Sequence, residues 1–544
     1  MVEATALRRV RGWIQRHWAT VLFVFAALGV VGCVTWDATY LRMVTWESGA
    51  DYWEHSASLH SLIENPWHPR HPHLNLTTGA PRFGPQFLLV ALVARALHWD
   101  PIQAMSLVSV LNALLFVSGI YVFFRSYFRH PLAPLYAVLV MFGGWWHAFH
   151  YSNAYSLPVL LAVASFPSTT ALGLTLFGFT LVVRVLRQQV ERKWLALLLI
   201  GVWAAAIFII HPLTAMMSFA GAFLLPLSNS KVTWRLRFEI VGAVVIGCAL
   251  SHFWPYFSPW VVLRGGHGQL SNWAGESMQQ AADLQVKRRL HPFYEPRGLL
   301  ATLGLAAIPL ALLPYFLVRR ERWFVGLGAL GMLLPFVANA FVQIPLGHRF
   351  VLLAIFFLHV GLVSLLLRLT PGHLGTFRWF RGRVMGIISM LVIFGTLLYF
   401  SDHTLHMVRS RFGNARYAGG RVSPVILNNR NYASAAGPDA VVLASATLSW
   451  PLPTFGPKVL ALLHDDPLIA DLAERDVSVK VFLAPDATDK ERKAIIRRYD
   501  VTHVLVQRHP ASLARFLEKF GTVQAFPSGV RLYTLRRRPA SEPN

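Results

Sequence analysis

A short segment near residue 50 gathers acidic and aromatic side chains of the kinds that can move a proton. Residues 46–55 read WESGADYWEH and carry the carboxyl groups of Glu47, Asp51 and Glu54. A carboxylate that aromatic neighbours partly shield from water can accept a proton from a hydroxyl group within hydrogen-bonding reach. The segment therefore predicts a general base. The alternative is an interfacial belt of aromatic residues with ordinary loop acids among them.

A histidine-rich segment follows at residues 66–73, which read PWHPRHPH. Imidazoles this close in sequence can bind one divalent ion. However, the residue before each proline is restricted to extended backbone, which points neighbouring rings apart. We therefore expect His68 and His71 to contact the substrate or lipid headgroups, or to serve the loop structure. We expect no cofactor, with a divalent metal as the less favoured alternative.

Other histidines lie beside the acidic segment, within apolar stretches or in a long loop. His55 ends the acidic segment, and His147 and His150 belong to the sequence WWHAFHYSN, whose aromatic and polar groups suit stacking on a sugar. His211 precedes a proline inside a long apolar run, and His267 belongs to a GGHG sequence. Polar groups at membrane depth usually face a cavity or a partner. We expect these histidines to bind substrate, with belt aromatics and a proline-marked turn as the alternative.

The composition excludes an ordinary soluble protein. Of the 544 residues, 55% are hydrophobic and only 14% are charged, whereas soluble domains carry about 25% charged residues. The apolar residues form blocks of about 17 to 25, the length needed to cross a hydrocarbon core about 30 Å thick. The net charge of +24 comes mainly from short loops between these blocks, where basic residues set topology and meet anionic headgroups. The sequence therefore predicts a polytopic α-helical membrane protein that binds membrane lipids and no nucleic acid.

The apolar blocks predict the spans and their orientation. Candidate spans cover residues 17–36, 84–99, 102–124, 132–149, 169–186, 194–211, 213–228, 239–263, 298–318, 323–342, 346–367 and 384–400. These make about twelve transmembrane helices, or thirteen if residues 151–167 form a further short or re-entrant crossing. Because basic loops stay on the cytoplasmic side, we expect a cytoplasmic amino terminus and a carboxyl-terminal region on the outer side of the cytoplasmic (inner) membrane. This orientation requires the thirteenth crossing at 151–167.

Two domains are expected. Residues 1–401 form the transmembrane domain, with long outer loops at 37–82 and 264–297, and residues 52–63 predict an amphipathic helix lying on the membrane surface. Residues 402–544 have the composition of a soluble α/β domain with a largely parallel sheet. Its expected strands are 440–444, 458–463, 479–483, 502–506 and 530–535, and its expected helices are 467–475, 487–498 and 511–520. This region contains no GxGxxG or Walker motif, so no nucleotide site is expected.

The order of these features resembles the GT-C superfamily of integral-membrane glycosyltransferases that use lipid-phosphate sugars. The shared features are an amino-terminal helix, a long first outer loop with an acid just after the membrane, many further spans and a final outer α/β domain. The matching residues are GADYWEH at 49–55, ASLHSL at 57–62, and RFGP at 82–85 before the second span. The superfamily often places an Asp-Glu pair at the first of these positions, and here Tyr52 stands in place of the second acid.

The resemblance implies roles for specific residues. It implies that Asp51 is the catalytic base, with Glu47 or Glu54 sharing the role. A sugar transferred from polyprenyl phosphate also requires a cation for the departing phosphate, and Arg349, beside His348 at the predicted outer end of a span, suits a bidentate contact to phosphate oxygens. The alternative for Arg349 is an arginine that extends to the interface without binding a substrate.

The leading hypothesis is therefore an inverting GT-C-type glycosyltransferase. It would move a hexosyl or pentosyl group from a polyprenyl-phosphate carrier to a lipid, glycan or protein acceptor on the outer face of the cytoplasmic membrane. Two alternatives are a transporter or flippase of a lipid-linked or anionic solute, and a polysaccharide polymerase or ligase.

Overall fold

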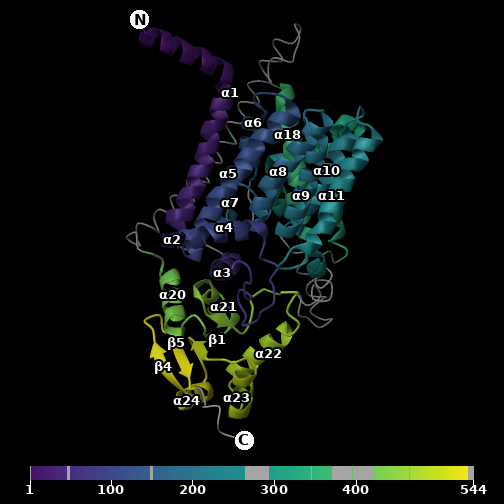
Figure 1. The fold of residues 1–544 in the computed structure, drawn as a ribbon. Helices are drawn as coiled ribbons and strands as arrows, with labels where there is room; N and C mark the ends of the chain where they lie inside the picture. Colours follow the sequence, from purple (N-terminus) through teal and green to yellow (C-terminus); the bar gives the residue numbers. More distant parts are fainter. Residues whose placement is uncertain are drawn as a thin grey trace. The chain divides into compact units, whose positions relative to one another are not determined.

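The computed structural model describes residues 2–45, 50–146, 151–263, 293–342, 344, 346–369, 395, 422–464 and 466–536. The chain divides into two compact units (Figure 1). The first unit contains Met1–Asp37, Ser109–His252 and Glu276–Gly413. The second contains Ala38–Val108, Phe253–Gly275 and Asn414–Asn544, so the first outer loop and the carboxyl-terminal segment belong to the same unit.

The first unit is a bundle of apolar helices. Its helices are α1 (Val2–Trp36), α5 (Pro101–Phe128), which begins in the second unit, α6 (Ala133–Gly143), α7 (Leu157–Val163), α8 (Pro167–Leu186), α9 (Lys193–Ile210), α10 (Pro212–Ser228), α11 (Trp234–Leu250), α14 (Pro296–Leu303), α15 (Ala307–Ala311), α16 (Leu313–Val318), α17 (Trp323–Ala338) and α18 (Phe350–Leu369). A single turn, η5 (Arg320–Arg322), precedes α17, and another, η6 (Gly347–Arg349), precedes α18. Because α18 packs against α6, α15 and α17, it is largely enclosed by protein.

The predicted polytopic helical membrane fold is confirmed. Within the described residues, seven helices are long and apolar enough to cross a membrane, and four shorter apolar helices accompany them. Together they coincide with eleven of the twelve predicted spans, while the twelfth, 384–400, lies outside the described residues apart from Gly395. Within 151–167 the structure forms only α7, whose seven residues extend about 10 Å and do not cross a bilayer as a helix.

The second unit combines α3 (Ala50–Glu64) and α4 (Pro85–Ala96) with the carboxyl-terminal segment. That segment forms α20 (Pro424–Ala436), β1 (Val441–Leu443), α21 (Ala446–Ser449), η8 (Leu452–Phe455), β2 (Lys458–Val459), α22 (Leu472–Leu483), α23 (Asp489–Arg498), β3 (His503–Val506), α24 (Ala511–Phe520), β4 (Gly521–Ala525) and β5 (Arg531–Leu535). The predicted carboxyl-terminal sheet is therefore present, and Figure 1 shows its strands beside α23 and α24.

The sheet is mixed, and the prediction of a largely parallel sheet was wrong. Its strand order is β2-β1-β3-β5-β4, in which β2, β1 and β3 are parallel while β5 is antiparallel to both β3 and β4. The short β4–β5 turn forces antiparallel pairing, since parallel neighbours need a long crossover. β4 was missed because its side chains after Gly521 are exposed and carry no buried pattern.

The predicted strand at 479–483 is also wrong, because these residues end helix α22. The alternation of VSVKV suggests a strand, but the buried residues are Leu472, Arg475, Val479 and Phe482. Spacings of three and four residues place these side chains on one face of a helix. Val477, which a half-buried strand would have turned inward with Val479, is 57% exposed.

The helix predicted at 52–63 forms as part of α3, but protein covers its apolar face. Residues 52–59 are all buried by protein. α3 packs against α4 and η8, and the hydroxyl groups of Ser56 and Thr454 lie 2.7 Å apart. The polar residues that made the helix look amphipathic therefore face the carboxyl-terminal segment.

Close packing of α9 on α11 generates a stability prediction. A methyl group added at Gly247 would overlap the backbone carbonyl oxygen of Gly201, whereas one added at Gly242 on the same helix meets nothing within 4 Å. Overpacking against backbone costs roughly 1–3 kcal/mol. We expect Gly247→Ala to lower the melting temperature of the detergent-solubilised protein and Gly242→Ala to leave it unchanged or raise it. Equal melting temperatures for the two variants would contradict this helix pairing.

Candidate functional site

The amino-terminal part of α3 carries the two described carboxylates of the acidic segment, with Asp51 in the first turn. Asp51 and Glu54 are three residues apart, so their side chains lie on the same side of the helix. Their surroundings differ: the side chain of Asp51 is 50% exposed, while that of Glu54 is 11% exposed. This difference separates an accessible carboxylate from an enclosed one.

Both oxygens of the Glu54 carboxylate are engaged by basic side chains. Oε1 accepts a hydrogen bond from Nε of Arg82 at 2.7 Å, and Oε2 lies 2.9 Å from Nδ1 of His464. Burial would raise the pKa of Glu54, but the charge of Arg82 and the bond to His464 outweigh it and hold the pKa well below its usual range. Glu54 is therefore a carboxylate anion at neutral pH and a poor proton acceptor.

His464 connects the two carboxylates. Its Nδ1 faces Glu54, and its Nε2 lies 3.6 Å from Oδ1 of Asp51. Burial would lower the pKa of His464, but the hydrogen bond to Glu54 and the charges of Glu54 and Asp51 raise it above its ordinary value. An imidazolium here presents an N–H toward Asp51 and limits the directions in which that carboxylate points.

The segment that carries His464 is held against the first outer loop. Lys458 of β2 donates from Nζ to the backbone oxygens of His71 and Pro72, both at 3.1 Å. The next residue, Val459, donates its backbone N–H to the oxygen of His73 at 2.7 Å. Burial lowers the pKa of Lys458 to about 8, and the carbonyl groups satisfy the ammonium donors that burial removes from water. This clamp fixes the start of the segment that leads to His464.

Sequence reasoning missed Arg82 and His464 as site residues. His464 follows β2 in the polar sequence LHDD at 463–466, just after the strand ends. Polar residues at a strand's carboxyl end are a recognised signal for a site, but nothing local pairs this one with Glu54, 410 residues earlier. Arg82 was noted only as part of the RFGP entry to the second span.

The predicted histidines of the first outer loop have separate surroundings. His55 is buried, with its ring centroid 5.5 Å from that of Phe87. His68 is exposed. His71 is buried; its Nε2 lies 3.2 Å from Oδ2 of Asp466, and its Nδ1 accepts backbone N–H bonds within the loop. His71 thus serves the same clamp as Lys458, and a substrate role for these histidines stays a prediction.

Arg349, the predicted phosphate ligand, lies in the first unit, in the turn η6. Its Nη1 donates to Oγ of Ser152 at 3.2 Å, and its guanidinium carbon lies 5.3 Å from the ring centroid of Tyr151. The ring of His348 lies 5.7 Å from the same tyrosine ring. The guanidinium is held by neutral groups of the kinds that orient an arginine toward an anion.

The turn that presents Arg349 is fixed by Asn339. Asn339 accepts the backbone N–H of Ile344 at 3.0 Å and donates to the hydroxyl oxygen of Tyr294 at 2.6 Å. Leu346 has a positive φ of 55°, and any Cβ at Gly347 would overlap the Asn339 side chain. Only glycine therefore fits at this position while the Asn339 bonds persist.

His211 lies at the start of α10. Its Nδ1 accepts from the backbone N–H of Thr214 at 3.2 Å and lies 2.8 Å from the Thr214 hydroxyl, which itself accepts from Asn153 at 2.8 Å. This is an amino-terminal helix cap. The ring nitrogen Nδ1 is therefore committed to structure, and substrate binding by His211 stays a prediction.

Four predicted site residues lie outside the described residues: Glu47, His147, His150 and His267. Their proposed roles stay predictions. The second outer loop, predicted at 264–297, is described only from residue 293 onward.

The donor atoms of Asp51, Glu54 and His464 lie within 4.8 Å of one another, a spacing that suits a divalent ion. However, both Glu54 oxygens already accept bonds from Arg82 and His464. An ion bound by all three residues would have to displace these two partners. The arrangement therefore fits an ion-paired carboxylate better than a metal site.

Comparison with solved structures shows that the chain shares its fold with two GT-C glycosyltransferases. No protein-family model matches the chain, and no curated protein matches its sequence. The oligosaccharyltransferase of Archaeoglobus fulgidus matches 96% of this chain and 75% of its own, with a TM-score of 0.52 and 12% identity. ArnT from Cupriavidus metallidurans matches 96% of this chain and 98% of its own at 14% identity, with TM-scores of 0.51 in the apo state and 0.52 bound to undecaprenyl phosphate.

This fold likeness and the apolar helices support a multi-pass membrane protein with a GT-C-like fold. At 12–14% identity the likeness concerns the fold, and the chemistry has to be argued from this chain's own residues.

The pair of His464 and Glu54 predicts a pH dependence of stability. The pKa of His464 is raised on folding. Its contribution to the free energy of unfolding is therefore fully present below the ordinary imidazole pKa of about 6.5, and it is lost as pH rises through the pKa of the folded state. The pKa of Glu54 is lowered on folding. Its contribution to the free energy of unfolding is therefore present above the ordinary glutamate pKa of about 4.3, and it is lost as pH falls through the pKa of the folded state. We expect His464→Ala to lower the melting temperature more at pH 6 than at pH 9 in a chelating buffer.

The matched control is His68→Ala, which removes an exposed imidazole from the same unit. Its effect on the melting temperature should be small and equal at the two pH values. A His464→Ala effect that is the same at both pH values would show that the charge of the imidazole contributes nothing.

Proposed function

We propose that this protein is an inverting glycosyltransferase that moves one sugar from a polyprenyl-phosphate carrier to an acceptor hydroxyl on the outer face of the cytoplasmic membrane. The observation that carries the proposal is the contrast between its two described acids. Glu54 is enclosed and held as an anion by Arg82 and His464, whereas Asp51 remains half-exposed on the same side of α3. Asp51 is thus the carboxylate available to an incoming hydroxyl.

The proposed step is a single displacement. Asp51 accepts the proton of the acceptor hydroxyl as its oxygen forms a bond to the anomeric carbon. The bond between that carbon and the phosphate oxygen breaks from the opposite side, so the configuration inverts and polyprenyl phosphate leaves with the electron pair. Arg349 is the proposed ligand of the phosphate, whose negative charge grows as the bond breaks. His464 and Arg82 act as positioning residues through Glu54.

The fold likeness to ArnT, one of whose structures contains undecaprenyl phosphate, supports a polyprenyl-phosphate donor for this chain. The acceptor in this proposal is a lipid, a glycan or a protein that presents a hydroxyl group. The amino terminus is proposed to be cytoplasmic. The basic loops 187–193, 231–237 and 319–322 then lie inside if residues 151–167 make a short further crossing.

Removal of the proposed base is the first test. We expect Asp51→Asn to lower transfer at least about a hundredfold, because the amide cannot accept the proton. Purified protein in nanodiscs would be incubated with a panel of radiolabelled polyprenyl-phosphate sugars and a membrane extract as acceptor. The control is Glu64→Gln, the same kind of change at an exposed residue of the same helix, which should leave turnover unchanged.

The products decide between the proposal and its alternatives. One added sugar supports a transferase, and a ladder of products indicates a polymerase. Solute flux through proteoliposomes without sugar transfer indicates a transporter. Near-normal turnover by a well-folded Asp51→Asn protein would exclude Asp51 as the base.

Removal of the proposed phosphate ligand is the second test. A hydrogen bond from a charged donor contributes about 1.5–3 kcal/mol, so Arg349→Ala should weaken undecaprenyl phosphate binding roughly 10- to 100-fold. Arg349→Lys keeps the charge but loses the planar guanidinium group. Its affinity for undecaprenyl phosphate should lie between those of the unmodified protein and Arg349→Ala. Binding would be measured by native mass spectrometry, with Arg235→Ala as the control because its side chain is 88% exposed on α11. Equal affinity in all variants would remove Arg349 from the proposal.

A further inference from the structure

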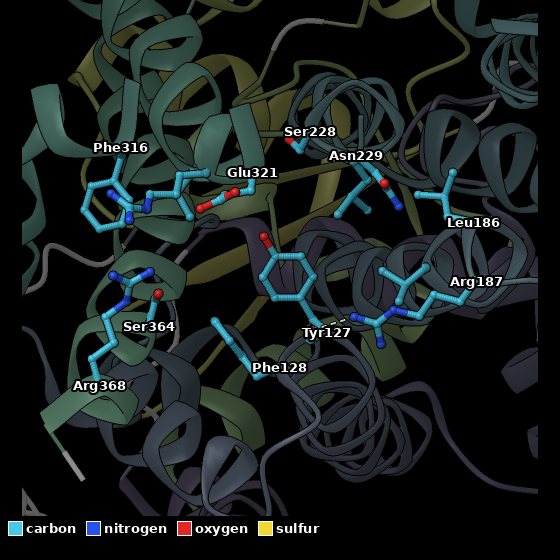
Figure 2. A pocket seen from close by; sticks show the side chains of 14 residues that line it. Tyr127, Phe128, Leu186, Arg187, Ser228, Asn229, Phe316, Glu321, Ser364 and Arg368 are labelled. Carbon is cyan, nitrogen blue, oxygen red and sulfur yellow. Dashed lines mark hydrogen bonds between the residues drawn. The ribbon is translucent and has the colours of Figure 1, made fainter. Parts of the chain in front are cut away.

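The first unit contains a cavity of about 330 Å³ that the proposed transfer reaction does not use (Figure 2). It lies where the carboxyl ends of α5, α8, α10 and α18 meet the α16–η5–α17 connection. Arg349 precedes the first residue of α18, whereas Arg368 of this cavity lies in its last turn. Since α18 has 20 residues, its ends are about 30 Å apart, and the cavity is remote from Arg349.

Three arginines from different elements line this cavity. Arg187 follows α8, Arg322 ends η5, and Arg368 belongs to α18. Figure 2 shows Arg187 and Arg368 extending toward Tyr127 from opposite sides of the view. The acidic residue in the lining is Glu321, whose side chain is exposed and lies 3.8 Å from Arg319. Positive charge therefore exceeds negative charge in this lining.

Each of these guanidinium groups is held by neutral partners. Arg187 donates to the backbone oxygens of Ser126 and Tyr127 at the end of α5. Arg322 donates to the backbone oxygen of Tyr315 at 3.1 Å and lies 3.8 Å from the ring centroid of the same residue, while Arg368 donates to its hydroxyl group. Among the described residues, no carboxylate forms an ion pair with Arg187, Arg322 or Arg368.

One of these guanidinium groups has a donor without a hydrogen bond. Nε of Arg322 is enclosed, and it has no hydrogen-bond partner in the described part of the chain. A buried charged donor without an acceptor is costly, and an anion near the accessible part of the guanidinium would offset part of this cost through its charge. Arginines that only set topology need not converge, whereas these three line one cavity.

The remaining lining indicates the chemistry of the ligand. The hydroxyl of Tyr127 and the amide of Asn229 add polar contacts, while Phe128 and Phe316 make part of the wall apolar. Arginine forks match the oxygens of a phosphate group, and aromatic walls suit the hydrocarbon next to a lipid headgroup. A ligand that is both anionic and apolar satisfies both parts of this lining.

We propose that this cavity binds the phosphate group of an anionic membrane lipid, at the end of α18 that is remote from Arg349. The site is separate from the proposed transfer chemistry, and its basic loops place it on the side that we assign to the cytoplasm.

The test measures lipid-dependent stabilisation of the full chain in detergent. We expect phosphatidylglycerol to raise the melting temperature in a saturable manner and phosphatidylcholine to have a much smaller effect. Inorganic phosphate at the same concentration should give no shift, since it lacks the apolar part. A shift of equal size with inorganic phosphate would overturn the assignment to a lipid.

Variants assign the effect to this cavity. Arg322→Gln with Arg368→Gln should weaken the apparent phosphatidylglycerol affinity at least tenfold. Arg184→Gln, which removes an exposed arginine from the last turn of α8, should not change it. Arg349→Ala should also retain the shift, which separates this site from the proposed donor site.

If the double variant does not fold, Arg368→Gln alone, whose side chain is exposed, should still weaken the affinity severalfold. Unchanged affinity in the folded double variant, or in Arg368→Gln when only that variant folds, would overturn the proposal.

Discussion

The candidate site depends on keeping a negative charge on an enclosed side chain. Burial of Glu54 without partners would favour its neutral form, which could exchange protons with any substrate nearby. Arg82 from the end of the first outer loop and His464 from the carboxyl-terminal segment prevent this by binding one oxygen each. The ion pairs also tie three distant parts of the sequence together, so the chemical state of Glu54 and the assembly of the second unit depend on each other.

This arrangement gives the two acids of α3 different roles. Glu54 orients the imidazole of His464 through Nδ1, and the other ring nitrogen, Nε2, limits the orientation of Asp51. A carboxylate that orients a histidine, which in turn acts on the reacting group, is a recurring way to position a base. The hydrogen bonds from Lys458 to the backbone of residues 71 and 72 support this arrangement, because they fix the strand that precedes the segment carrying His464.

Local patterns in the sequence predicted most of the architecture. Apolar block length located eleven helices, and the acidic spacing placed Asp51 and Glu54 on one helix. The predictions failed where the structure depends on contacts between residues far apart in the sequence. The burial of α3 by protein was not predicted, because the segment that buries it lies some 400 residues later, as the contact of Ser56 with Thr454 illustrates. Arg82 and His464 were missed for the same reason, since a partner for a buried acid has no local signature.

The central claim is that Asp51, and not Glu54, meets the acceptor hydroxyl. The most direct measurement is an experimental structure of the protein with a non-transferable polyprenyl-phosphate sugar and an acceptor bound. We expect a carboxylate oxygen of Asp51 within about 2.6–3.2 Å of the acceptor hydroxyl, with Glu54 still bound to Arg82 and His464. An acceptor hydroxyl bonded to Glu54 or to no acid, with Asp51 directed into solvent, would contradict it.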